Sequence, residues 1–203
     1  MAEAATIADL PLVAGHPALD FTNTAAWASD RVLKEHLVDY SALLAWSLRT
    51  GLIGLAQEKA MRARSVARPR EADRVLHRAQ ELREALHDIF AAHAENTTAP
   101  QHALKRLNRS LAEGLVHARI AKKGSAFEWT WEGAPDALDR MLWPVARFAA
   151  ELLASNQLSR VRQCAGENCG WLFIDTSKNR ARRWCSMSDC GNRAKVRRFR
   201  ERQ

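Results

Sequence analysis

The chain has 203 residues, of which 47% are apolar, and it carries 31 Lys or Arg against 23 Asp or Glu. A chain of this length holds one large domain, or one medium domain with a small module. No apolar run is long enough to cross a bilayer, and the N-terminal residues lack the basic segment of a signal peptide. We therefore expect a cytoplasmic protein with no membrane partner.

The first segment with a distinctive composition follows residues 1–15, which are expected to form a poorly structured lead-in. Asp20 and Asn23 stand three residues apart in an apolar stretch, so on a helix they would share a face. Two interpretations stay open on this spacing. The favoured one is local capping and turn hydrogen bonds, and the other is a polar patch that lines a ligand pocket.

Helical patterns fill most of the chain up to residue 115. Asp39 can cap a helix that ends at Gly51, and a short helix is expected around Leu55–Arg64. The strongest signal covers residues 69–93, where apolar residues recur at steps of three and four. A leucine stripe over residues 104–115 predicts one more helix.

The period then changes from that of a helix to that of a strand. Residues 115–120 and 127–131 alternate apolar and polar side chains around a Lys-Lys-Gly-Ser segment, which predicts a β-hairpin. Its aromatic side chains would share one face and need cover. A longer helix is expected from Pro135, with a kink at Pro144. Residues 16–157 are thus predicted to form one mainly helical domain with a minor hairpin.

This domain shows no catalytic pattern. Its histidines lack the three- or four-residue spacing of a helical metal pair, and there is no Gly-rich phosphate loop or nucleophile elbow. We therefore predict no enzyme activity, and an enzyme in this domain is the least favoured of three hypotheses. A deep pocket that holds Asp20 with a strongly perturbed pKa would revive it.

All four cysteines lie in residues 158–203. Cys164 and Cys169 form one pair, Cys185 and Cys190 form the other, and four residues separate the members of each. Two equal pairs with fifteen residues between them predict one tetrahedral zinc ion. Four thiolates leave no open position for water, so the zinc would be structural. Two disulfides are the less favoured alternative, since nothing indicates an exported protein.

The excess positive charge also lies in this module. Residues 160–203 carry twelve Lys or Arg and four Asp or Glu, a net charge of +8, which equals that of the whole chain. Charge of one sign confined to a small module is typical of a protein that binds a polyanion. The alternative is a solvated basic tail that only aids solubility. The predicted nucleic-acid contacts are Arg180, Arg182, Arg183, Arg193, Lys195, Arg197 and Arg198.

The order of elements predicted for the module is that of a treble-clef-like zinc fold: a knuckle, a hairpin and a helix. Residues 171–174 and 181–184 would pair as strands. The final helix, at about 189–201, would dock Val196 and Phe199 on that hairpin, and its basic stripes would face outward. Such a small module needs the metal to fold.

The sequence around the second cysteine pair, Cys190-Gly191-Asn192-Arg193 preceded by Arg182-Arg183-Trp184-Cys185, resembles the signature of the CGNR zinc-finger family. The segment Leu19–Thr24 is similar to the Leu-Asp-Phe-x-Asn-Thr segment of the ABATE domain that often precedes it. This resemblance implies a bacterial transcription regulator with a helical sensor-like domain and a zinc finger that binds DNA. It also gives Asp20 and Asn23 more weight than spacing alone.

Together these observations favour a transcription regulator that binds duplex DNA through the basic module. Its helical domain would bind a small-molecule effector or a second copy of the chain to form a homodimer. The alternative is an RNA- or ribosome-associated protein that uses the same basic surface, because the residues alone do not exclude RNA.

Overall fold

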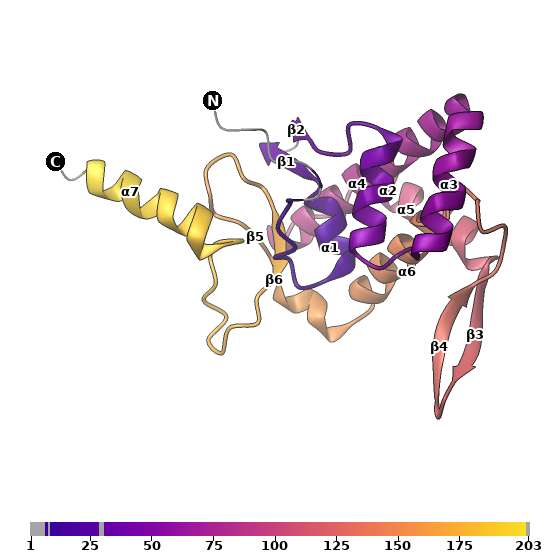
Figure 1. The fold of residues 1–203 in the computed structure, drawn as a ribbon. Helices are drawn as coiled ribbons and strands as arrows, with labels where there is room; N and C mark the ends of the chain where they lie inside the picture. The colour runs from indigo at the N-terminus through magenta and orange to yellow at the C-terminus, as the bar shows by residue number, and fades with distance from the viewer. Residues whose placement is uncertain (1–6, 8, 29–30, 202–203) are drawn as a thin grey trace.

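The computed structural model describes residues 7, 9–28 and 31–201, and it is mainly helical, as the sequence predicts (Figure 1). The described strands pair into separate two-stranded antiparallel sheets. The elements, in chain order, are α1 (Pro17–Thr22), β1 (Ala25–Ala28), β2 (Arg31–Glu35), α2 (Tyr40–Arg49), α3 (Leu55–Ala67), α4 (Pro69–Ala94), α5 (Gln101–Leu115), β3 (Ala118–Lys123), β4 (Ala126–Trp131), α6 (Leu142–Leu153), η1 (Asn156–Arg160), β5 (Val161–Gln163), β6 (Leu172–Ile174), η2 (Met187–Gly191) and α7 (Asn192–Arg200).

Helix α4 is the long central helix of the N-terminal domain, and helices α1, α2, α3 and α5 pack against it. Its apolar face is buried, with Leu82, Leu86 and Phe90 fully removed from solvent. Pro69 occupies the first turn, where its missing N–H costs no hydrogen bond. Because burial of each such side chain stabilises the fold by about 1.5–3 kcal/mol, this stripe anchors the domain. The strongest helix signal in the sequence is therefore confirmed.

Helix α1 is short but lies where the two parts of the chain meet. Ala18, Leu19 and Phe21 have no exposed surface, and the helix packs against α4, α6 and the C-terminal strand β6. At the end of the helix, the polar residues Thr22, Asn23 and Thr24 are also buried. This burial places the Leu-Asp-Phe-x-Asn-Thr segment in the core of the molecule.

The segment before α1 differs from the expected lead-in. Leu10 and Ala14 are buried, and the guanidinium of Arg49 donates a hydrogen bond to the Leu10 carbonyl oxygen at 2.5 Å. The Ala14 carbonyl oxygen accepts one from the Ile174 N–H at 2.8 Å. The described part of residues 1–15 is thus held by long-range hydrogen bonds, which leave no periodic signal in the sequence.

The predicted hairpin is present as β3 and β4, with a two-residue turn at Gly124-Ser125. Gly124 has a φ of +61°, which suits a tight hairpin turn. The hairpin projects from the helices (Figure 1), and Phe127 and Trp129 remain 71% and 45% exposed. The guanidinium of Arg147 lies 5.0 Å from the Trp129 ring, and the Trp131 ring lies 6.3 Å from that of Trp143. The aromatic face is thus partly covered, and Phe127 is its most exposed residue.

The expected helix start at Pro135 and the kink at Pro144 are both wrong. Helix α6 begins at Leu142, after a run of turns, so Pro144 falls in its first turn. A proline is tolerated there because no helical N–H is lost. The helix therefore starts near its proline and is not bent by it.

The C-terminal module contains an antiparallel hairpin, but not the one expected between the two cysteine pairs. Strand β6 pairs with β5, which precedes Cys164, and residues 181–184 form no strand. Asp175 explains the difference: its carboxylate accepts hydrogen bonds from the Ser177 N–H at 2.9 Å and the Arg182 N–H at 3.1 Å. A buried carboxylate thus satisfies the backbone of this loop in place of strand pairing.

Candidate metal centre and nucleic-acid interface

The four cysteines converge on one point. Their Sγ atoms all lie within 4.8 Å of one another, and the distances from Cys185 Sγ to Cys169 Sγ and to Cys190 Sγ are both 3.6 Å. Four sulfurs at about 2.3 Å from a central zinc are separated by about 3.8 Å, so the spacing fits a tetrahedral site. It is far from the ~2 Å of a disulfide, and all four cysteines are free.

Two tight backbone segments position these sulfurs. The first pair lies in the loop that joins β5 to β6, and this loop turns through Asn168 and Gly170 at φ values of +53° and +61°. In the second pair, Cys185 precedes η2, a single π-helical turn that leads into α7, and Cys190 lies within that turn. At Gly166 an added Cβ would lie only 2.9 Å from Cys190 Sγ. The loop needs glycine there to approach the sulfurs.

Hydrogen bonds favour thiolates at this site. Cys164 Sγ accepts from the N–H groups of Cys185 at 3.2 Å and Gly166 at 3.4 Å, and the Arg193 guanidinium donates to Cys190 Sγ at 2.9 Å. Hydrogen bonds from Cys169 and Cys185 lower the pKa of Cys164 to about 2. The hydrogen bond between the two side chains has the opposite effect on Cys169 and raises its pKa to about 12. Without a metal, the crowded thiols cannot all ionise, so metal binding releases their remaining protons.

The donor set therefore fits one structural zinc ion, held by Cys164, Cys169, Cys185 and Cys190. All four side chains are at most 8% exposed, and four thiolates complete the coordination of zinc. Zinc would supply binding free energy on the order of 10 kcal/mol to a module with a small apolar core. The zinc ion would therefore stabilise the fold of the module and leave no coordination position for a substrate.

Asn23 joins the helical domain to this module. Its side-chain amide donates to the Leu172 carbonyl oxygen and accepts from the Leu172 N–H, both at 2.9 Å. Asn23 is 1% exposed and Leu172 is fully buried. The amide thus pairs with the open edge of β6 as a neighbouring strand would.

A second set of contacts holds the loop between β5 and β6 (residues 164–171, hereafter the zinc loop) against the helical domain. The Trp27 N–H donates to the Cys169 carbonyl oxygen at 3.2 Å, and Trp27 stacks on His87 with ring centroids 3.7 Å apart. His87 Nε2 lies 3.1 Å from the Gly170 carbonyl oxygen, so it donates there as the neutral tautomer. Burial lowers the pKa of His87 to about 4. An added Cβ at Gly170 would lie 2.5 Å from the Trp27 Cβ, so only glycine permits this approach.

Asp20 belongs to the same region but not to the same contact. Its carboxylate accepts a hydrogen bond from the Ala14 N–H at 3.1 Å, and burial raises its pKa to about 6. The Asn23 side chain bonds to β6, so Asp20 and Asn23 make separate hydrogen bonds, each to backbone groups. The side chain that caps α1 is His16, which accepts from the Ala18 N–H, while Asp20 holds the segment before the helix. The long-range role of Asn23 was missed, because nothing in the spacing links residue 23 to residue 172.

The seven predicted nucleic-acid contacts divide into two groups. Arg182 is directed inward: it donates to the carbonyl oxygens of Trp184 and Val13, both at 3.0 Å, and its guanidinium lies 4.2 Å from the Phe173 ring. It therefore acts as a structural residue. The exposed residues of the predicted set are Arg180, Arg183, Arg193, Lys195, Arg197 and Arg198.

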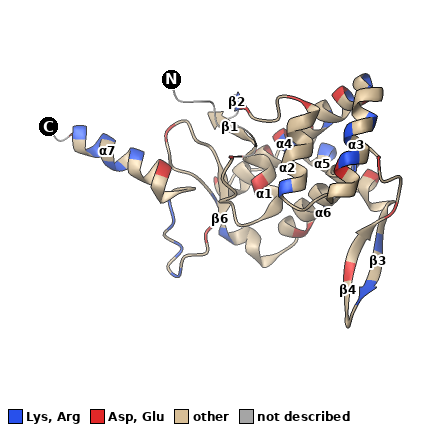
Figure 2. Ribbon diagram, viewed as in Figure 1, with Lys and Arg blue, Asp and Glu red and all other residues tan. Residues whose placement is uncertain are grey.

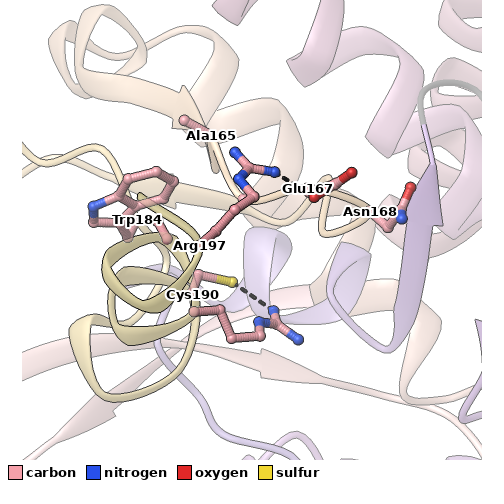
Figure 3. A pocket seen from close by; sticks show the side chains of 9 residues that line it. Ala165, Glu167, Asn168, Trp184, Cys190 and Arg197 are labelled. Carbon is pink, nitrogen blue, oxygen red and sulfur yellow. Dashed lines mark hydrogen bonds and ion pairs between the residues drawn. The ribbon is translucent and has the colours of Figure 1, made fainter. Parts of the chain in front are cut away.

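Two of these exposed arginines also make contacts within the zinc module. Figure 3 shows the Arg197 guanidinium paired with the Glu167 carboxylate. Arg193, in the first turn of α7, donates a hydrogen bond to Cys190 Sγ. A cavity of about 180 Å³ lies between the loop and the helix, lined also by Trp184. Lys195 and Arg198 lie elsewhere on the helix, and Figure 2 shows the basic residues along α7, which extends away from the helical domain.

Fold and site together define a protein of two parts: a helical domain and a four-cysteine zinc module docked on it. Residues 15–156 match the family model of ABATE, described as "Putative stress-induced transcription regulator", and residues 160–203 match that of the CGNR zinc finger. The chain therefore belongs to the ABATE family and ends in a CGNR zinc finger, which confirms the resemblance seen in its sequence. A search of the curated proteins finds no match.

These families are regulatory or zinc-binding and are not defined by a catalytic activity. Among the helices that the structure describes, none combines the length and the apolar character that a membrane span requires.

Proposed function

We propose that this protein is a cytoplasmic transcription regulator that binds duplex DNA through its zinc module. The observation that carries the proposal is the exposed basic helix α7, which the zinc site and the Arg193 and Arg197 contacts hold in one orientation. The whole excess charge of +8 lies in residues 160–203. Arginine suits both phosphates and guanine edges, and a zinc-held helix fits the major groove.

The helical domain would supply the regulatory part. Asn23 bonds to strand β6, and Trp27 and His87 contact the zinc loop, so a change in the helical domain would reach the DNA-binding module through them. We propose that a small-molecule effector or a second copy of the chain binds the helical domain, away from Asn23, and causes that change.

The test is the salt dependence of binding by the full-length, zinc-loaded protein to a labelled duplex. Each phosphate contact contributes about 0.9 to the slope of log K against log salt, so a surface of this charge should lose binding steeply between about 50 and 200 mM. The double variant Lys195→Ala with Arg198→Ala should lower the slope by about two.

The matched control is Arg70→Ala with Arg74→Ala, two exposed arginines on α4 in the helical domain. This control should keep the wild-type slope. An affinity that stays flat over the salt range, or a Lys195/Arg198 variant that binds as the wild type does, would refute the proposal. Tighter binding to a structured RNA than to the duplex would favour the RNA-associated alternative.

A further inference from the structure

Helix α7 leaves its large apolar side chains in solvent. Val196 is 50% exposed and Phe199 is 64% exposed, and no residue of the helix is buried. The expectation that these two residues would dock on the module's hairpin is therefore wrong. The hairpin lies on the other side of the zinc loop, against the helical domain, where α1 packs on β6.

The exposed apolar residues form one row with basic rows on both sides. At 100° per residue, Asn192, Val196 and Phe199 follow one another along a single line of the helix. Arg193, Arg197 and Arg200 form the row on one side, while Lys195 and Arg198 lie on the other. The opposite side of the helix carries the half-buried Ala194, which faces the module.

A groove of duplex DNA has a complementary arrangement of charge and polarity. Its two walls are phosphate backbones and its floor is the edges of the bases. The major groove, about 12 Å wide, admits a helix, and the apolar group it presents is the C5-methyl of thymine. A helix with cations on both flanks and an apolar row between them complements that groove in charge and polarity.

Two contacts give this row a fixed direction. The ion pair of Arg197 with Glu167 ties one flank of α7 to the zinc loop. On the same flank, Arg193 donates a hydrogen bond to the sulfur of Cys190, which lies in η2. Helix α7 extends away from the helical domain (Figure 1), so a duplex could approach the helix without meeting that domain.

We infer that Val196 and Phe199 are the base-contacting residues of α7 and that they recognise thymine methyl groups in the major groove. The inference rests on the proposed DNA binding and adds the residues that would read sequence. An anionic membrane would also attract a basic helix. However, two large apolar side chains on a nine-residue helix give little area to insert into lipid, whereas membrane-surface helices carry a broad apolar face.

The experiment compares two duplexes that differ only in methyl groups: alternating A·T DNA, and the same duplex with deoxyuridine in place of thymidine. Full-length zinc-loaded wild type should bind the thymine duplex more tightly, by about fourfold for each methyl group that is buried. The variant Val196→Ala with Phe199→Ala should bind both duplexes equally, with the salt slope of the wild type. Zinc content and circular dichroism verify that the variant is folded.

Phe127→Ala is the matched control, because Phe127 is an equally exposed phenylalanine on the distant hairpin β3–β4. It should keep the wild-type preference. If the wild type binds duplex DNA but does not distinguish thymine from uracil, or if the double variant keeps the preference, this inference is overturned and the proposed function stands. If the wild type binds neither duplex, the proposed function itself fails. Loss of binding to phosphatidylserine vesicles, with DNA binding unchanged, would assign the two side chains to a membrane instead.

Discussion

Replacement of Asn23 by alanine should uncouple the zinc module from the helical domain. The wild-type amide satisfies both the N–H and the carbonyl oxygen of Leu172 at 2.9 Å, in a place where neither residue is more than 1% exposed. The variant leaves both backbone groups buried without a partner. Each unsatisfied group costs about 1–3 kcal/mol, so we expect the two together to destabilise the protein by about 2–6 kcal/mol.

The assay is urea unfolding of the zinc-loaded protein, with a chelator competition in parallel. The midpoint should fall while the slope of free energy against urea stays constant. Zinc should be lost faster, because Leu172 begins the strand that closes the loop of Cys164 and Cys169. Asn23→Asp should be at least as destabilised as the alanine variant, since a carboxylate would face the Leu172 carbonyl oxygen.

The control for this prediction is Asn179→Ala, at an exposed turn of the same module. Surface substitutions of this kind change stability by about 0.5 kcal/mol or less. If Asn23→Ala unfolds within that range of the wild type and keeps its zinc equally well, the assignment of Asn23 as the link between the two parts is wrong.

Three further predictions concern the metal and its surroundings. Metal analysis should give about one zinc per chain, and a strong chelator should unfold residues 160–203 before the helical domain; a folded metal-free module would contradict this. Arg193→Ala should release zinc faster than Arg198→Ala, because the wild-type Arg193 side chain donates to a cysteine sulfur and is the one of these two arginines placed on the metal site; equal release rates would refute it. For His87, the folded pKa of about 4 lies below the unfolded 6.5, so the unfolded state binds more protons between these values. Stability should fall as the pH is lowered from 6.5 to 4, by up to about 3 kcal/mol more in the wild type than in His87→Phe. Parallel pH profiles of the two proteins in urea unfolding would contradict this.

Local signals in the sequence predicted the helices and the metal ligands. The spacing of the cysteine pairs predicts a tetrahedral site because the ligand chemistry of zinc allows few alternatives. The periodic apolar face of α4 predicts a helix because the burial of that face determines its conformation. In both cases the residues that give the signal are those that make the structure.

Contacts between distant residues could not be predicted in this way. Asn23 pairs with a strand 149 residues away, and its amide would look the same in a turn. Arg182 is one arginine in a basic run, and only its contacts with Val13 and Phe173 show that it is structural. The expected order of elements placed a strand at residues 181–184, but the Asp175 carboxylate holds that backbone instead. Tertiary hydrogen bonds decided each of these cases.

The most direct test of the central proposal is a competition between a duplex DNA and a structured RNA for the full-length protein at one salt concentration, repeated after zinc removal and after zinc is restored. We predict that the duplex binds more tightly, that binding is lost with the metal, and that it returns with zinc. Binding that survives complete zinc removal, or a preference for RNA, would contradict a zinc-held DNA-binding module.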